Sequence, residues 1–193
     1  MARRRISSAA LVVAVLTLSL TGCHQASVRY NTRYAALLSQ PLPKILHIPV
    51  DGVTRVSNSW GMHRDGGRHH QGIDIFAARN TPIRSITEGV VEFKGMRGLG
   101  GQVIYIVGPG GYRHYYAHLE EFGLQAEGDW VEAGEVIGYV GNSGNAAISS
   151  THLHYGLYSP GGRAVNPYTY LRAGEPFMKI AAADQQTIQQ AAK

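Results

Sequence analysis

Histidines and one aspartate are the residues of this chain whose types and spacing point most directly to chemistry. His70 and Asp74 lie four residues apart in the segment H-Q-G-I-D, and His118, His152 and His154 follow downstream in strand-like surroundings. Imidazole nitrogens and carboxylate oxygens are ligands of catalytic zinc, which takes three protein groups and leaves a fourth position for water. The two groups left over are natural acids and bases, because the pKa of imidazole lies near neutral pH.

Strand periodicity separates some of these residues from their neighbours. In an extended strand, residues i, i+2 and i+4 share a face, so His152 and His154 project together, as do His70 and Asp74. His69 is five residues from Asp74 and is expected to face the other way. We therefore expect His70, and not His69, to join the cluster.

Periodicity does not decide between His114 and His118. The same alternation places both on one face with Tyr116, so two histidines compete for one role on that strand. We interpret His63 and His114 as residues at the surface or behind the metal ligands. His24 and His47 fall outside the pattern, and we assign them no role.

The fold class follows from short β-branched or aromatic runs separated by glycine-rich turns. Glycines gather in G-L-G-G, G-P-G-G and G-N-S-G, where hairpin turns need positive φ. These features predict a mostly β domain, an antiparallel sheet forming a partly open, barrel-like β-sandwich with little helix. The expected strands are 72–76, 82–86, 90–94, 103–107, 112–118, 136–140 and 153–158.

The first residues have the pattern of a secretory signal. Met1 to Arg5 is basic, Ala9 to Thr21 is apolar, and Leu-Thr-Gly precedes Cys23, the single cysteine of the chain. That segment resembles the lipobox of bacterial lipoproteins, which implies lipidation of Cys23 and attachment to a membrane without spanning it. The resemblance and His24 together favour a bacterial cell envelope location, at the periplasmic face of the outer membrane in a diderm.

The expected organisation is a lipoprotein signal peptide over residues 1–22, a stem with one or two helical turns over 23–44, a compact domain over 45–172 and a weakly helical or disordered tail over 173–193. Much of the net charge of +5 comes from Arg3, Arg4 and Arg5 of the signal segment. The remainder is nearly neutral and has no basic stripe interleaved with aromatic residues. We therefore expect no nucleic-acid binding.

Several ordered motifs together resemble the lysostaphin-like zinc metallopeptidases, the LytM-type domain, between about Ser57 and Leu171. They are G-R-H-H-Q-G-I-D-I, T-P-I-R-S-I-T-E-G-V-V, Y-Y-A-H-L, G-D-W-V-E-A-G-E-V-I-G-Y-V-G-N-S-G, H-L-H-Y and N-P-Y. The resemblance implies one zinc ion on His70, Asp74 and His154. It also implies that His118 and His152 are catalytic histidines that do not bind the metal.

The chain departs from the family pattern in two places. Asn80 replaces a glycine before Thr81-Pro82, and asparagine is the residue besides glycine that best tolerates positive φ. Residues 146–151 replace a glycine- and proline-containing approach to H-L-H. We expect this second segment to form part of a groove wall and to affect substrate preference.

The resemblance implies a zinc-dependent endopeptidase that hydrolyses peptide cross-links of bacterial peptidoglycan. The alternative is an envelope lipoprotein that binds the wall or activates another hydrolase without cleaving anything. Degenerate relatives of that kind typically lose ligands or catalytic histidines, whereas this chain has all five residues. A biotinyl or lipoyl carrier domain, suggested by the segment E-G-V-V-E-F, would leave the histidines unexplained. Neither the bond cleaved nor which of His118 and His152 is the base follows from the sequence.

Overall fold

The computed structural model describes residues 27–53 and 55–176, with side chains described up to residue 171. A helix spans residues 27–39, where one or two helical turns were expected. The described chain falls into two units, with the second beginning at Leu37. The expectations for the signal segment and Cys23 lie outside the described residues. Within those residues, no helix has both the length and the apolar character needed to cross a membrane.

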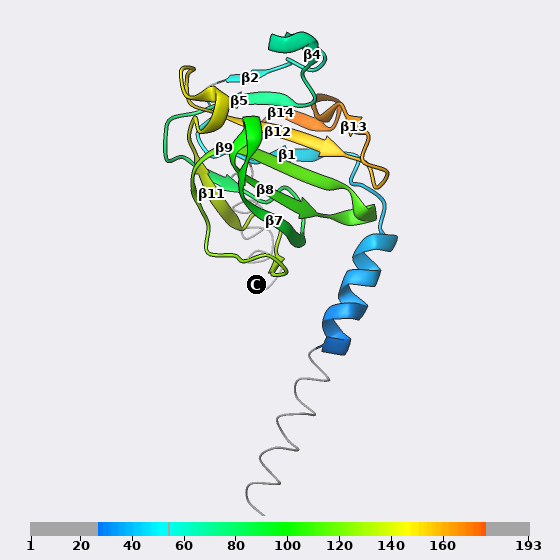
Figure 1. Ribbon diagram of the computed structural model, residues 1–193. Coiled ribbons are helices and arrows are strands. Elements are labelled where there is room, and N and C mark those ends of the chain that lie inside the picture. The colour runs from blue at the N-terminus through cyan, green and yellow to red at the C-terminus, as the bar shows by residue number, and fades with distance from the viewer. Residues whose placement is uncertain (1–26, 54, 177–193) are drawn as a thin grey trace, which may run out of the picture. The chain divides into compact units, whose positions relative to one another are not determined.

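The second unit is built on one large antiparallel sheet, which confirms the predicted fold class (Figure 1). The order of its main strands is β10 (Trp130–Val131), β7 (Gly89–Arg97), β8 (Gly101–Val107), β9 (Arg113–Phe122), β12 (His152–Tyr158), β5 (Ile73–Phe76) and β2 (Arg55–Ser57). In addition, β11 (Val136–Val140) pairs with β9 and with β6 (Pro82–Arg84), and β13 (Ala164–Val165) pairs with β12. Among the described strands, no pairing joins β10 to β2, so this sheet does not close into a barrel.

Two smaller pairs complete the strand set. Parallel strands β1 (Leu46–Ile48) and β14 (Leu171–Pro176) pair with each other, and β3 (His63–Arg64) and β4 (Arg68–His69) form a hairpin around the 3-10 turn η1 (Asp65–Gly67). The remaining 3-10 turns are η2 (Gly98–Gly100), η3 (Pro109–Gly111), η4 (Gly144–Ala146) and η5 (Pro167–Thr169). Strand β14 runs four residues into the expected tail, and residues 177–193 lie outside the description.

All seven predicted runs form strands. Each of the three glycine clusters adjoins a strand end as expected: the first connects β7 to β8, the second connects β8 to β9, and the third follows β11. Asn80 has a φ of 63°, so asparagine occupies the left-handed conformation that the turn requires.

The sheet has an apolar core face and a polar face. Ile73, Ile75, Leu153 and Tyr155 alternate along β5 and β12 and are fully buried in the core. The residues between them, Asp74 on β5 and His152 and His154 on β12, point to the opposite face. Strand alternation thus fixes which side of the central strands carries chemistry.

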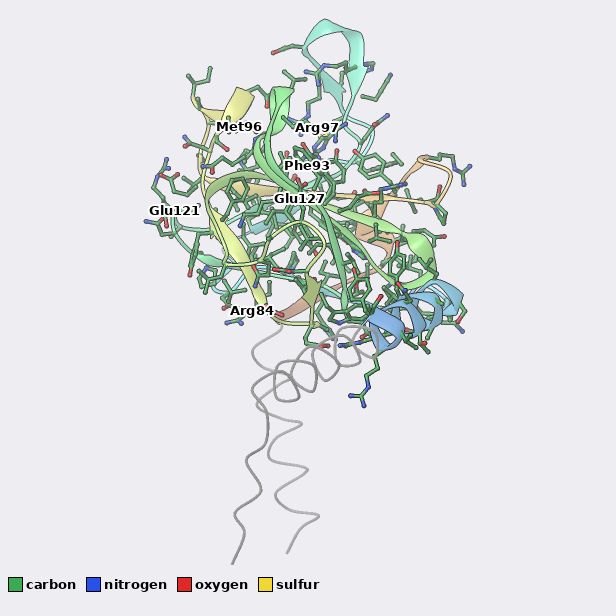
Figure 2. All side chains as sticks on the ribbon, turned by 60° about the horizontal axis from the view of Figure 1, so that its bottom comes forward. Arg84, Phe93, Met96, Arg97, Glu121 and Glu127 are labelled. Atoms are coloured by element: carbon green, nitrogen blue, oxygen red, sulfur yellow. The ribbon has the colours of Figure 1, made fainter. Side chains whose placement is uncertain are left out.

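The β3–β4 hairpin, η2 and η4 each contribute residues to one groove, together with Asp74, His152 and His154 of the polar face. The β7–β8 hairpin that carries η2 is supported by Arg97, whose guanidinium carbon lies 5.5 Å from the centre of the Phe93 ring and 5.3 Å from that of Tyr105 (Figure 2). These cation–π contacts hold the end of the hairpin, from which Leu99 projects into the groove described below.

Candidate active site

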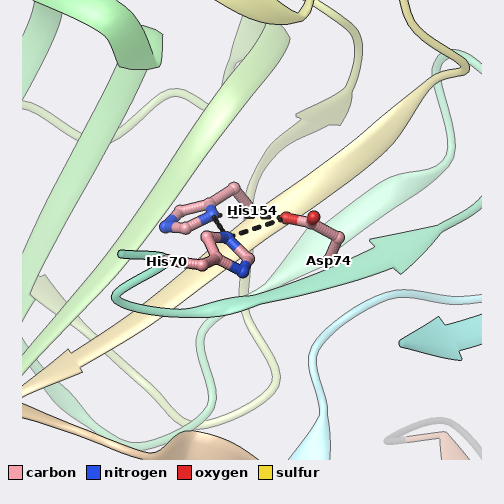
Figure 3. A group of neighbouring side chains, drawn as sticks. All are labelled: His70, Asp74 and His154. Carbon is pink, nitrogen blue, oxygen red and sulfur yellow. Dashed lines mark hydrogen bonds and ion pairs between the residues drawn. The ribbon is translucent and has the colours of Figure 1, made fainter. Parts of the chain in front are cut away.

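His70, Asp74 and His154 converge on one point of the polar face (Figure 3). Asp74 and His154 are directly opposite each other on β5 and β12, and His70 lies in the loop entering β5. The Oδ1 atom of Asp74 is 3.3 Å from His70 Nε2 and 3.3 Å from His154 Nδ1, and the two nitrogens are 2.8 Å apart. The structure therefore brings together the three residues predicted to hold a metal.

The donor set fits a small divalent cation. Tetrahedral zinc with ligands at 2.0–2.1 Å would place its donor atoms about 3.3 Å apart, which is the value of two of the three separations. His70 donates its Nδ1–H to the carbonyl of Ser59 at 2.9 Å, so its Nε2 lone pair faces the cluster. A carbonyl behind a histidine in this way is the usual support of a metal ligand.

Arg64 holds the other carboxylate oxygen of Asp74. Arg64 lies on the β3–β4 hairpin, and its Nη2 atom donates to Oδ2 of Asp74 at 2.6 Å. This contact leaves Oδ1 as the oxygen that faces the two histidines. Sequence reasoning missed Arg64, because the hairpin that brings it to Asp74 is visible only in the fold.

The charge states of the cluster follow from its surroundings. Burial alone would raise the pKa of Asp74, but its contacts with His154 and His70 hold it well below its usual range. Burial lowers the pKa of His154. The cluster therefore presents a carboxylate beside a neutral imidazole, the protonation states that metal ligands need.

His118 and His152 lie beside the cluster, with ring centres 5.0 Å apart. His118 donates Nδ1–H to the Ser143 carbonyl and His152 donates Nδ1–H to the Ser150 carbonyl, each at 2.8 Å. Both contacts use Nδ1 and leave Nε2 without a backbone partner; Nε2 of His152 lies 3.8 Å from Asp74 Oδ1. Burial, with a smaller effect of the nearby His154, lowers the pKa of His118 to about 4, so that this imidazole is neutral at physiological pH.

The expectation that His114 and His118 share a face is wrong. His118 has a φ of 64°, and the β8–β9 register shifts between Tyr116 and Leu119, so an extra residue bulges from the strand. His118 therefore lines the polar face, whereas His114 is fully buried on the core side, with Nδ1 2.8 Å from the hydroxyl of Tyr155. This bulge separates two histidines that spacing could not.

His69 and His63 lie outside the cluster. Both are exposed on the β3–β4 hairpin, where their ring centres are 4.6 Å apart, and His69 donates Nδ1–H to the Gly61 carbonyl at 3.0 Å. The adjacent His70 is buried. The two neighbouring histidines thus point to different surroundings, as alternation predicted.

The model of Peptidase family M23 matches residues 68–167, more than half of the 193 residues. This chain belongs to Peptidase family M23. The matched region contains the three cluster residues His70, Asp74 and His154 and also the two adjacent histidines, His118 and His152.

Several M23 relatives have assigned activities. An L-Ala–D-Glu endopeptidase of Bacillus subtilis is 43% identical over 62% of this chain and 40% of its own length. A DD-carboxypeptidase/endopeptidase Mpg of Neisseria meningitidis is 41% identical over 59% of this chain and 26% of its own length. This chain therefore aligns with less than half of each of these relatives.

Solved structures share the M23 fold. The catalytic domain of lysostaphin from Staphylococcus simulans is 28% identical, with a TM-score of 0.52, over 59% of this chain and 89% of that domain. Csd3 of Helicobacter pylori is also 28% identical, with a TM-score of 0.56, over 79% of this chain and 45% of its own. These likenesses agree with the open antiparallel sheet seen here.

In this M23 domain, the metal cluster lies in a groove of about 730 Å³. The β3–β4 hairpin forms one wall, and η2 and η4 contribute Leu99, Gly100, Asn145 and Ala146. Ser149 lines the groove as well, which confirms that the segment 146–151 forms part of the wall. His70, Asp74, His154, His118 and His152 all line this groove.

Proposed function

We propose that this chain is a zinc-dependent endopeptidase that hydrolyses peptide cross-links of bacterial peptidoglycan. The main support is that the groove residues fall into two groups. Three donor atoms converge on one point, whereas the two imidazoles of His118 and His152 are oriented by backbone carbonyls through Nδ1. A binding module would need neither the converging donors nor the free bases. The M23 relatives with assigned peptidase activity support the same reaction.

In this proposal, His70 Nε2, His154 Nδ1 and Asp74 Oδ1 hold one zinc ion. A zinc ion with an open position polarises a scissile carbonyl and lowers the pKa of water. Arg64 fixes the Asp74 carboxylate, and Ser59 fixes the ring of His70. These two contacts preorganise the donors, so little reordering is needed when the metal binds.

His118 and His152 supply the proton transfers. Each ring directs Nδ1 to a backbone carbonyl, so Nε2 is the atom left to act on a substrate amide placed over the cluster. One imidazole removes a proton from the attacking water at Nε2 and, as the imidazolium, gives that proton to the leaving amine. The other, in its protonated form, donates a hydrogen bond from Nε2–H to the developing oxyanion. Burial favours the neutral, proton-accepting form of His118.

Purified peptidoglycan provides the test. We expect the zinc-loaded protein to release soluble peptides from intact sacculi, and mass spectrometry of the products to identify one class of cleaved peptide bond. Stoichiometric zinc without cleavage of any of several wall types would instead favour the alternative, a wall-binding or hydrolase-activating protein.

We also propose that Cys23 is lipidated and anchors the domain at the bacterial envelope, at the outer membrane in a diderm. The support is the pattern of basic, apolar and small residues that precedes Cys23. Membrane fractionation of the wild type and of Cys23→Ser tests the anchor. We expect the wild type in the membrane fraction and Cys23→Ser in the soluble fraction, and retention of the variant on the membrane contradicts lipidation.

A further inference from the structure

A second cavity of about 390 Å³ continues from the groove beyond His152. Phe76 lines both cavities, and the second is otherwise lined by Arg55, Ala77, Ala78, Ser150 and Thr151. The mechanism proposed above uses none of these side chains. This cavity is therefore a place where a substrate bound in the groove would make contacts away from the reacting bond.

Strand register places Arg55 in line with the candidate catalytic histidine. His152 is opposite Phe76 across β12 and β5, and Phe76 is opposite Arg55 across β5 and β2. Residues directly opposite each other project to the same face of a sheet. The three side chains accordingly form a row, with the His152 and Phe76 ring centres 5.3 Å apart and the Arg55 guanidinium carbon 4.1 Å from the centre of the Phe76 ring.

The Arg55 guanidinium lies over the Phe76 ring, and this cation–π contact uses none of its N–H donors. The N–H groups therefore stay available to a substrate group. Among the side chains that the structure describes, no carboxylate forms an ion pair with Arg55. By contrast, Arg64, Arg79, Arg84 and Arg113 each pair with an acidic residue. Arg55 thus presents an oriented positive charge that lacks an acidic partner there.

We propose that Arg55 and Phe76 form a subsite for a carboxylate of the substrate peptide. A carboxylate matches the planar fork of the guanidinium and can accept two hydrogen bonds from it. The proposal rests on the proposed function, because it places the carboxylate relative to a bond held over the metal cluster. Arg55 and His152 lie on strands two spacings apart, with β5 between them, which is about 10 Å. The carboxylate therefore belongs to a residue about three positions from the reacting bond in an extended peptide.

The subsite has a consequence for substrate choice. Peptides with a free side-chain or terminal carboxylate near the reacting bond would bind better than the same peptides with that group amidated. A bridge made of glycine alone has no side-chain carboxylate to offer. Arg55 therefore favours acidic stem peptides over neutral bridges.

Equilibrium binding of soluble muropeptide dimers tests the subsite apart from catalysis. The ligands are dimers purified from one wall, used as free acids and after conversion of their carboxylates to carboxamides with carbodiimide and ammonia. The protein is the zinc-loaded chain with His118→Ala, which prevents turnover. We expect the free acids to bind about tenfold more tightly than the amides, the magnitude of one charge-assisted hydrogen-bonded contact.

Variants of Arg55 supply the decisive comparison. Arg55→Gln is expected to bring the two affinities within about twofold of each other by weakening binding of the free acids alone, and Arg55→Lys to retain part of the preference. Arg163→Gln is the matched control, because Arg163 is exposed and lines neither cavity. It should keep the full preference.

The results that overturn the subsite differ from those that overturn the proposed function. Three results refute the subsite. The first is equal binding of acids and amides by the His118→Ala protein that retains Arg55, and the second is a preference for acids that persists in folded Arg55→Gln. The third is no binding of either ligand at millimolar concentration. If the preference for acids depends on Arg55 but the wild type cleaves no peptidoglycan, the subsite is supported and the endopeptidase function is refuted.

Discussion

The Arg64 guanidinium binds the Asp74 carboxylate oxygen that the two histidines leave free. Nη2 lies 2.6 Å from Oδ2, while Oδ1 lies 3.3 Å from a nitrogen of each of His70 and His154. A carboxylate held on one side by an arginine presents one oxygen to a metal in a fixed direction. Arg64 is exposed by 39%, so its contribution comes from orientation of Asp74 more than from the strength of the ion pair.

We therefore expect Arg64→Gln to weaken zinc binding about tenfold, the lower end of the effect of removing a residue that supports a metal ligand. Competition with a chromogenic chelator measures the zinc affinity directly. Arg68→Gln is the control on the same hairpin, because Arg68 donates through Nε to the backbone carbonyl of Asp65 and does not contact Asp74. Equal zinc affinities of Arg64→Gln and the wild type would show that Asp74 does not need this contact.

Ser143 offers a separate test of how His118 is held. Its Oγ donates to the Leu119 carbonyl at 2.8 Å and accepts from the backbone N–H of Gln102 at 2.9 Å, and its own carbonyl accepts from His118. We expect Ser143→Ala to lower kcat about tenfold, because the carbonyl that orients His118 loses two supports. Zinc content should not change, and Ser159→Ala, at a position that lines neither cavity, should keep the wild-type kcat. A loss of zinc in Ser143→Ala would contradict this separation of roles.

Gly72 lies against the metal cluster. A Cβ atom there would be 2.6 Å from His154 Cε1 and 2.6 Å from the Tyr155 carbonyl oxygen, so alanine cannot fit without moving β12 or the His154 ring. We expect Gly72→Ala to lower the free energy of unfolding by about 1–3 kcal/mol, the usual cost of overpacking, and to weaken zinc binding. Gly161→Ala, where a Cβ meets nothing within 4 Å, should do neither. Urea unfolding measures the stability and chelator competition measures the zinc affinity. If Gly72→Ala and Gly161→Ala have the same stability and the same zinc affinity, Gly72 does not lie as close to His154 and Tyr155 as described.

His114 should make the fold sensitive to acid. Burial lowers the pKa of His114 from 6.5 to about 3, so between these values the unfolded chain binds a proton that the folded protein does not. Stability due to this group is therefore complete above pH 6.5 and falls as the pH drops toward 3, with a slope of up to about 1.4 kcal/mol per pH unit. We expect His114→Gln to reduce the slope of unfolding free energy against pH in this window. His63→Gln, at an exposed site, should leave the slope unchanged, and an unaltered slope in His114→Gln would show that His114 titrates normally.

Local pattern was sufficient for much of the fold. Alternation of apolar residues and the glycine clusters identified the central strands, and alternation also placed Asp74, His152 and His154 on one face of β5 and β12. These features depend on residues close in sequence. They could be read without knowing which strands pair.

Other features depend on the pairing itself. The bulge at His118 reverses the alternation of β9 and moves His118 to the polar face, away from the core side that holds His114, and no residue type in Y-Y-A-H-L signals that extra residue. The contacts of Arg64 with Asp74 and of Arg55 with Phe76 likewise arise from a hairpin and an edge strand whose registers the sequence does not reveal. The assignment of His118 over His114 accordingly rested on family resemblance until the fold supplied its physical reason.

In the proposed mechanism, His70, Asp74 and His154 hold the metal while His118 and His152 move protons. Zinc content and peptidoglycan cleavage, measured on the same preparations of wild type, His154→Ala and His118→Ala, separate these two roles. We predict about one zinc ion per wild-type chain with release of peptides, loss of both zinc and cleavage in His154→Ala, and retention of zinc with loss of cleavage in His118→Ala. A folded wild type that binds no zinc, or a His118→Ala protein that cleaves at the wild-type rate, would contradict the account.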